Sequence, residues 1–291
     1  MSPWVLRGLR EGVVTTRWPA SADAYADGWR GPVVVAVADA DADARVDDAA
    51  GLAEICPTGA IGLGPRQEPR LDTGRCVLCG RCVRERPDVF AWSSGIAAAS
   101  LSRPGLVVPV PDLPETEENL AALRDALAVR TSALRRSVHL RHVDAGSDGS
   151  EEQEIAALLN PVYDIGRLGL FFTATPRHAD VLLVTGAGAH GMAEPLRLTY
   201  EGMPDPKVVI AVGTDAVSGG MLGADGYATS GGVGEVVPVD VWLPGSPPPP
   251  FAILQALLLG LGRLPGSGRG AGSRGAGSRG AGSPAVKGGR S

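Results

Sequence analysis

The second half of the chain alternates short apolar runs with longer segments whose apolar residues recur at helical spacing. Strands are expected at 138–143, 168–173, 181–185, 208–212 and 236–241. Helices are expected at 151–159, 192–202 and 251–261. Because strands alternate with helices, the pattern predicts an α/β domain with a mostly parallel sheet covered on both faces.

The first hundred residues carry shorter elements. Strand candidates at 60–63 and 69–72, joined through Gly64-Pro65, predict a hairpin, and 83–90 predicts a short helix that stops near Pro87. These elements predict a small α+β domain. Five acidic residues are expected on the solvated face of an earlier helix: Asp39, Asp41, Asp43, Asp47 and Asp48.

An N-terminal arm precedes these elements. Residues 4–10 predict a short amphipathic helix, and 13–19 an extended stretch that leads towards Trp29-Arg30-Gly31-Pro32. The tryptophans of the arm either anchor it to a partner or a membrane surface, or pack it over the small N-terminal core. The pattern leaves both interpretations open.

A proline-rich linker joins the two halves, and a low-complexity tail ends the chain. The linker prolines are Pro104, Pro109, Pro111 and Pro114. Residues 115–129 predict a helix whose leucines at 120, 123 and 127 are expected to pack. The Gly-Ser-Arg-Gly-Ala repeat of 266–291 lacks the apolar content of a core and is expected to be disordered, with its arginines solvated. The chain is therefore expected to divide into the small N-terminal domain with its arm at 1–100, the linker and its helix at 101–136, the α/β domain at 137–264 and the tail at 265–291.

Length and charge narrow the function classes. A chain of 291 residues has room for about two domains. A net charge of −5 argues against a general nucleic-acid binder. We see no secretory signal, and the best apolar run, 251–261, is too short to span a bilayer. The few cysteines fit a reducing, cytoplasmic location.

All four cysteines lie between residues 56 and 82. Cys76, Cys79 and Cys82 form a C-x-x-C-x-x-C loop, and Cys56 begins a distant Cys-Pro pair. This spacing is typical of a 4Fe–4S cluster, with three thiolates from one loop and a fourth from elsewhere. Zinc would favour two separated pairs or nearby histidines, and a disulfide framework conflicts with three cysteines so close together. We therefore expect one 4Fe–4S cluster.

The frame of a second cluster motif remains without its cysteines. Counting back from Cys56, the three expected positions are Val46, Ala49 and Leu52, and counting forward from Cys82, the fourth is Arg86. The proline that would follow survives as Pro87. Only one cluster is therefore expected in this half.

The second half resembles a known family in four runs. They are NPVYD at 160–164, TPRHADVLLVTG at 175–186, MPDPK at 203–207 and VPVDVWLPGSPP at 237–248. Residues 137–262 resemble the B-type subunit of NADH:quinone oxidoreductase and the small subunit of membrane-bound NiFe hydrogenases of the formate-hydrogenlyase type. The first half, with Thr15-Thr16 and Trp29-Arg30-Gly31, resembles the ferredoxin-like I-type subunit of the same complexes. The resemblance implies two electron-transfer subunits joined in one chain.

The resemblance also implies partners and a place in the cell. The partners would be a large subunit with a NiFe or quinone site and the membrane subunits of the complex. The location would be the cytoplasmic face of the membrane, held peripherally. We expect apolar surface for the large subunit at 247–251.

The chain departs from the family at every cluster ligand of the α/β domain. The ligand positions are occupied by Asp148, Glu151, Asp215 and Ser246. Oxygen ligands are poor for a 4Fe–4S cluster, so this domain should carry none. The carboxylates either form a hard-cation site or fill an emptied pocket with polar groups, and we expect the second.

A glycine-rich loop offers another interpretation. Gly186, Gly188 and Gly191 form G-x-G-x-x-G between an expected strand and an expected helix, and Asp215 should end the next strand. That context is typical of a dinucleotide site, although the family resemblance accounts for the loop without a nucleotide.

The sequence thus predicts a non-catalytic electron-transfer subunit that carries one 4Fe–4S cluster. The alternatives are a structural or assembly subunit that lost its redox role, or a dinucleotide-binding α/β protein.

Overall fold

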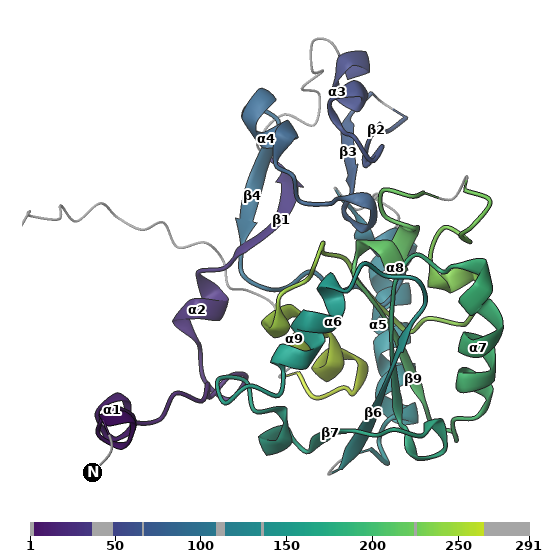
Figure 1. The fold of residues 1–291 in the computed structure, drawn as a ribbon. Coiled ribbons are helices and arrows are strands. Elements are labelled where there is room, and N and C mark those ends of the chain that lie inside the picture. The colour runs from purple at the N-terminus through teal and green to yellow at the C-terminus, as the bar shows by residue number, and fades with distance from the viewer. Residues whose placement is uncertain are drawn as a thin grey trace, which may run out of the picture.

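The computed structural model describes residues 3–36, 49–65, 67–108, 114–134, 137–223 and 226–264. Figure 1 shows an α/β body with a smaller group of strands and helices above it and an N-terminal arm beside it. The aspartates at 39–48, Val46, the prolines at 109 and 111 and the tail beyond 264 lie outside the described residues. Of the helices within these ranges, none is both long and apolar enough to cross a membrane.

A five-stranded sheet forms the centre of the α/β body, in the order β10-β9-β8-β6-β7 with every pair parallel. Its strands are β6 (Val138–Asp144), β7 (Leu170–Phe172), β8 (Val181–Thr185), β9 (Val208–Val212) and β10 (Val241–Leu243). Every residue of β8 and β9 is buried, because helices cover both faces. The predicted parallel α/β sheet is confirmed.

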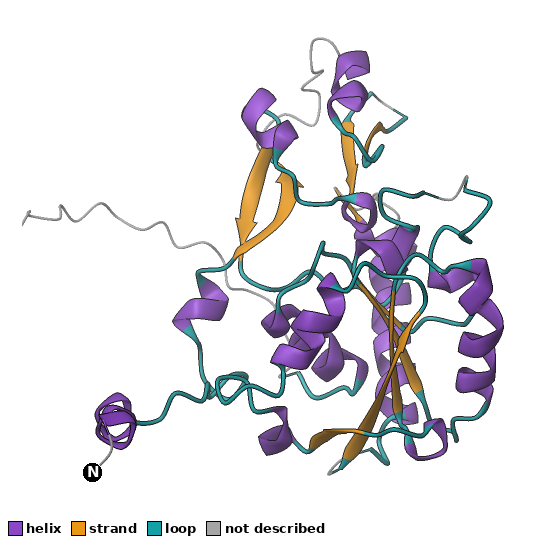
Figure 2. Ribbon diagram, viewed as in Figure 1, coloured by secondary structure: helices purple, strands orange, loops and turns teal. Residues whose placement is uncertain are grey.

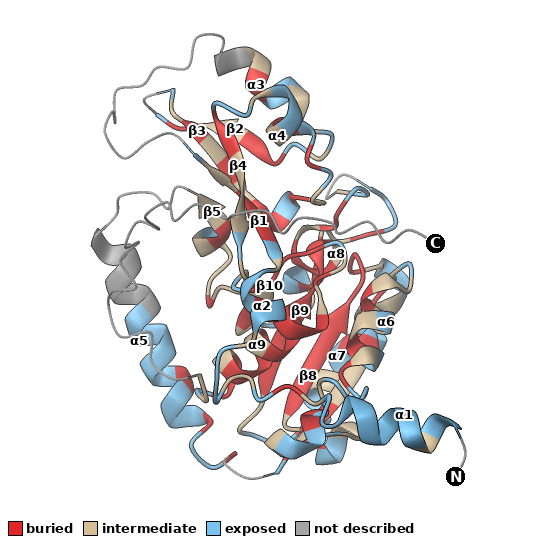
Figure 3. Ribbon diagram, turned by 90° about the vertical axis from the view of Figure 1, so that its left-hand side faces the viewer, coloured by how far each residue is buried: buried red, intermediate tan, exposed pale blue. Residues whose placement is uncertain are grey.

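Helices divide between the two faces of this sheet (Figures 1 and 2). On one face, α6 (Ser150–Ala157) and α9 (Pro250–Gly260) pack on alternate strand residues such as Val181 and Leu183. On the other, α7 (His190–Glu201) and the short α8 (Thr214–Ser218) pack on the residues between, such as Leu182 and Val184. Figure 3 shows the resulting buried centre. The expected helices are confirmed, and α8 was not foreseen.

Two strand boundaries were wrong. The last strand begins at Val241 rather than 236, since Pro238 has no N–H for a ladder and Val236 follows a 3-10 turn at Val233–Glu235. The second begins at Leu170 rather than 168, because Ile165–Leu168 form a 3-10 turn that ends on left-handed Gly169.

The linker helix is α5 (Pro114–Arg130), as expected, but its leucine stripe packs only in part. Leu127 is buried in the core of the α6 and α9 face, whereas Leu123 is 45% exposed.

The smaller group consists of two antiparallel sheets and two short helices. β1 (Arg30–Val35) pairs with β4 (Phe90–Ser94), and β2 (Ile61–Leu63) pairs with β3 (Pro69–Asp72), which also pairs with β5 (Val107–Val108). The helices are α3 (Ala49–Ile55) and α4 (Arg81–Glu85). The predicted hairpin is confirmed. The second helix ends earlier than expected, because Pro87 disfavours helical backbone at Arg86, and Phe90 already belongs to β4.

The N-terminal arm contains α1 (Pro3–Glu11), which stands apart from the α/β body in Figure 1, and α2 (Ala24–Asp27), which lies beside that body. The rings of Trp18, Tyr25 and Tyr163 surround Phe251 at centroid distances of 6.1, 6.2 and 5.0 Å. Phe251 is therefore 2% exposed. The expected apolar docking surface at 247–251 was wrong in this respect, because the chain's own arm covers its central aromatic side chain. Trp4 is 75% exposed, so this part of the arm has no cover.

Candidate functional site

All four cysteines line one pocket in the smaller group. Cys56 follows α3, Cys76 follows a 3-10 turn at Thr73–Arg75, and Cys82 lies in the first turn of α4. The loop between them turns through left-handed backbone at Leu78 and Gly80. Glycine is needed at 80, because a Cβ atom there would lie 2.7 Å from the ring of Trp92. The predicted ligand set is thus brought together.

The sulfur atoms lie in a setting that suits thiolate ligands. The N–H of Ala60 donates to Cys56 Sγ at 3.3 Å, and the N–H groups of Leu78 and Val83 donate to Cys76 and Cys82. Burial, reinforced by the neighbouring thiolates, raises the pKa of Cys76 to about 11 and also raises that of Cys82. Bare thiolates are therefore disfavoured here unless positive charge joins them.

Four cysteine sulfurs around one pocket are the donor set that a 4Fe–4S cluster takes. The described residues contain no group of three or more His, Cys, Asp or Glu side chains placed to hold one metal ion. A cubane meets each thiolate at a separate corner, so its ligands can stand farther apart than those of one zinc ion. Cys56, Cys76, Cys79 and Cys82 would hold such a cluster.

The positions of the vanished second motif have other roles. Leu52 is fully buried in the small core beside Phe90. Arg86 forms an ion pair with Asp88 at 2.7 Å. At these positions the side chains stabilise the fold, and they offer no soft ligand.

The four positions at which cluster ligands are expected to be replaced lie at the carboxyl edge of the sheet in the α/β body. Asp148 stands in the loop after β6, Glu151 in the first turn of α6, and Asp215 in the first turn of α8. Asp215 was expected to end a strand, but β9 stops at Val212. Ser246 lies exposed in the loop after β10.

Three of these positions interact electrostatically. Burial raises the pKa of Glu151 to about 7, and the carboxylates of Asp215 and Asp148 reinforce the rise. Burial also raises the pKa of Asp215, with Asp148 again adding to it. The hydrogen bond from Ser150 holds the pKa of Asp148 below its usual range. Within the described ranges, these carboxylates are not grouped as ligands of one cation.

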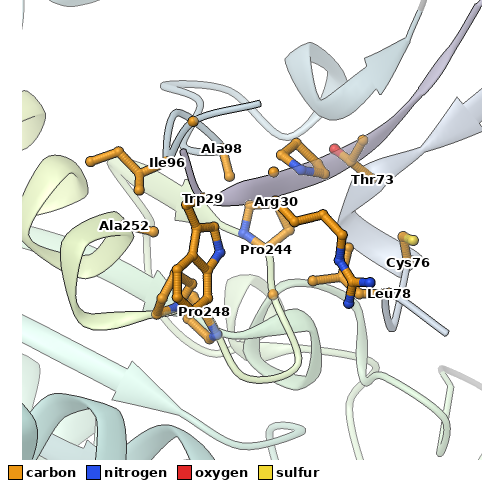
Figure 4. A pocket seen from close by; sticks show the side chains of 15 residues that line it. Trp29, Arg30, Thr73, Cys76, Leu78, Ile96, Ala98, Pro244, Pro248 and Ala252 are labelled. Carbon is orange, nitrogen blue, oxygen red and sulfur yellow. The ribbon is translucent and has the colours of Figure 1, made fainter. Parts of the chain in front are cut away.

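Thr214 connects this edge to the cysteine loop. Its buried hydroxyl donates to the backbone carbonyl of Cys76 at 3.1 Å and accepts from the N–H of Gly245 at the same distance. A small apolar cavity lies beside this contact (Figure 4). Figure 4 shows Trp29, Pro248 and Ala252 on one side of it and Thr73, Leu78 and Cys76 on the other. The cysteine loop and the emptied ligand positions therefore adjoin each other.

The glycine-rich loop is occupied by the protein's own backbone. The N–H groups of Ala187, Ala189 and His190 donate to the carbonyls of Gly146, Ala145 and Ala228. Cβ atoms at Gly186 and Gly188 would lie 2.5 Å from the backbones of residues 146 and 232. Close packing of loops accounts for these two glycines, and three amides of the loop already donate to backbone carbonyls rather than being free for a pyrophosphate. A Cβ atom at Gly191 would meet no atom within 4 Å.

Two residues of this region were missed from the sequence: Thr214, which contacts the cysteine loop, and Ser150, which lies between two carboxylates. Neither belongs to a motif of chemically distinctive residues, and the contact of Thr214 joins residues 138 positions apart.

The α/β body is similar in sequence to known proteins. The family model described as NADH ubiquinone oxidoreductase, 20 Kd subunit, matches residues 149–259. Formate hydrogenlyase subunit 7 of Escherichia coli (strain K12) is 38% identical over 157 residues, which are 54% of this chain and 59% of that protein. A probable membrane-bound hydrogenase subunit of Pyrococcus furiosus is 40% identical over 142 residues, which are 49% of this chain and 84% of that protein.

Among solved structures, a chain of the membrane-bound sulfane sulfur reductase (MBS), an archaeal respiratory membrane complex, is 29% identical, with a TM-score of 0.40. The match covers 46% of this chain and 74% of that chain. The sequence matches, together with the five-stranded parallel sheet, identify the α/β body. The chain belongs to the family of the NADH ubiquinone oxidoreductase 20 Kd subunit.

Proposed function

We propose that the chain is an electron-transfer subunit that carries one 4Fe–4S cluster on Cys56, Cys76, Cys79 and Cys82. The observation that carries this proposal is the single pocket lined by all four cysteines, which are the only cysteines of the chain. A cluster supplies one-electron transfer, and the chain's residues bind it, orient it and tune it through N–H groups that donate to sulfur.

The cluster would lie in a ferredoxin-like domain, 1–100, joined to the α/β domain of 137–264. The hydrogen bond from Thr214 to Cys76 would fix the cluster loop against the sheet edge where the family's own cluster ligands are missing. The α/β domain would then act as a scaffold, and electrons would enter and leave through the ferredoxin-like domain. The chain itself would make and break no covalent bonds of a substrate.

The complex would be of the membrane-bound hydrogenase or NADH:quinone oxidoreductase type. Its large subunit would hold the catalytic centre, and membrane subunits would hold the assembly peripherally at the cytoplasmic face. Since Phe251 is covered by the arm, the apolar contacts of the large subunit would come from elsewhere. Exposed Met221, Leu222 and Tyr227 in the segment after α8 are the better candidates.

The test is anaerobic reconstitution of the full chain with iron and sulfide. We expect about four irons and four sulfides per chain and a low-potential EPR signal on reduction. Cys79→Ser should abolish the signal, whereas the matched control Asp215→Asn should retain it, because the acidic positions hold no cluster. Iron retained in full by Cys79→Ser, or lost in Asp215→Asn alone, would contradict the ligand assignment.

The second candidate function is a structural or assembly subunit. It is supported by the oxygen side chains of Asp148, Glu151, Asp215 and Ser246 at positions where the family resemblance would place cluster cysteines. A folded, partner-bound chain without iron after native purification and reconstitution would support this candidate against the first.

A further inference from the structure

Glu151 is the only charged residue among the buried side chains of the described residues. It is 1% exposed and lies near the start of α6, under the carboxyl edge of the sheet. Its carboxyl group packs against Gly213, where a Cβ atom would lie 2.5 Å from Glu151 Oε1. Electron transfer through the proposed cluster does not require Glu151. Burial of an ionised carboxylate without a neighbouring cation costs folding free energy.

The hydrogen bonds to Glu151, from its own backbone N–H and from the Ser150 hydroxyl, lower its pKa, and burial outweighs them. Ser150 Oγ lies 2.6 Å from Asp148 Oδ1 and 3.1 Å from Glu151 Oε2. A hydroxyl group has one proton to donate. Exposed Asp148 takes the larger share of it over the shorter contact, which also keeps the pKa of Asp148 low. The Ser150 hydroxyl is thus shared between the two carboxyl groups, and its bond to Glu151 is the longer one.

The charges that face Glu151 favour its protonated form. They are the carboxylates of Asp148, from the loop before α6, and of Asp215, from α8. Glu151 takes part in no ion pair among the residues that the structure describes. Burial and these two carboxylates raise its pKa to about 7, where a modest change in local charge alters its protonation.

Glu151 is held close to the cysteine loop. Gly213, against which it packs, is followed by Thr214, whose hydroxyl donates to the carbonyl of Cys76 at 3.1 Å. Reduction of a cluster adds one negative charge to that loop. As a general scale, a unit charge about 10 Å away at an effective dielectric constant of about 20 changes the proton affinity of a carboxylate about tenfold.

We propose that Glu151 is a proton-binding site coupled to the redox state of the cluster. When a low-potential one-electron donor delivers one electron to the cluster, Glu151 takes up a proton from water in part of the molecules, and the electron and the proton leave on reoxidation. Asp148 and the Ser150 hydroxyl connect the buried carboxyl to solvent. This inference rests on the proposed function, because it needs the cluster at the four cysteines.

The test is a redox titration of the cluster-loaded full chain, monitored by EPR between pH 6 and pH 9. In the wild type, the midpoint potential should fall with rising pH from about pH 7. A tenfold difference in proton affinity between the two redox states amounts to about 59 mV in total. Glu151→Gln should remove most of this pH dependence, and the remainder would come from Asp215, whose pKa burial also raises. Glu154→Gln is the matched control on the same helix and should keep the wild-type dependence.

A second measurement does not depend on the variant folding. The infrared difference spectrum of the oxidised, cluster-loaded wild type between pH 6 and pH 8 should contain a carboxylic-acid C=O band that disappears at the higher pH. A wild-type potential that does not change with pH, an absent band, or equal slopes in wild type and Glu151→Gln would each overturn the inference and leave the proposed function standing. A chain that takes up no iron would refute the proposed function, and this inference with it.

Discussion

Replacing Glu151 by glutamine should make the folded chain more stable at pH 8 and leave its stability nearly unchanged near pH 4.5. Glutamine has the shape of the protonated carboxyl group and bears no charge. It therefore removes the cost of ionising a side chain that is 1% exposed and faces Asp148 and Asp215.

The size of the effect follows from proton linkage. The pKa of Glu151 rises on folding from 4.5 to about 7, so the folded chain binds more protons than the unfolded chain between these pH values. Its contribution to stability is thus fully present below about pH 4.5 and is lost as the pH rises to about 7. Each pH unit is about 1.4 kcal/mol, which gives a cost of up to about 3 kcal/mol for the wild type above pH 7.

The measurement is urea denaturation of the full chain, followed by far-UV circular dichroism at pH 5 and pH 8. The free energy of unfolding should fall less steeply with pH in Glu151→Gln than in the wild type. Some slope should remain, because burial raises the pKa of Asp215 as well. Exposed Glu201→Gln, at the end of α7, is the control and should follow the wild type. Equal pH dependence in Glu151→Gln and the wild type would refute a raised pKa at Glu151.

Two further predictions concern contacts that join distant parts of the chain. Thr214→Val removes the hydroxyl that donates to the Cys76 carbonyl, so the absorbance of its cluster should bleach several-fold faster in air than that of the wild type. Thr229→Val is the control, because it loses a hydroxyl hydrogen bond to Gly223 elsewhere in the chain. Equal bleaching rates in the two variants would show that Thr214 does not hold the cysteine loop. Phe251→Ala should cost about 3–5 kcal/mol of stability and expose the N-terminal arm to limited proteolysis, whereas exposed Phe171→Ala should do neither; an arm that stays protected would mean that other contacts hold it.

Local sequence signals determined much of this protein. Apolar runs such as 181–185 and 208–212 are buried strands. In a sheet covered on both faces, every residue of a strand faces apolar surroundings, so a continuous apolar run suits such a strand whichever strands pair with it. The C-x-x-C-x-x-C spacing likewise places three thiolates on one loop, because residues so close in the chain stay close in the fold. The four substituted ligand positions could likewise be read from the family pattern without any structure.

Other features depended on residues far apart in the chain. The start of β10 at Val241 depends on its pairing with β9, and the five-residue α8 is too short for a periodic signal. The arm covers Phe251 because aromatic rings more than two hundred residues apart meet in space. Amphipathic patterning shows that a face is apolar, and it does not show which surface covers that face.

The site itself combines both kinds of information. Sequence alone predicted the four candidate cluster ligands and indicated that Asp148, Glu151 and Asp215 offer no thiolate, because residue identity decides ligand softness. Only the tertiary structure decided that Glu151 is buried, that Ser150 lies between two carboxylates, and that Thr214 bonds to Cys76. Burial and neighbouring charge set a pKa, and both arise from contacts between segments that no local pattern records.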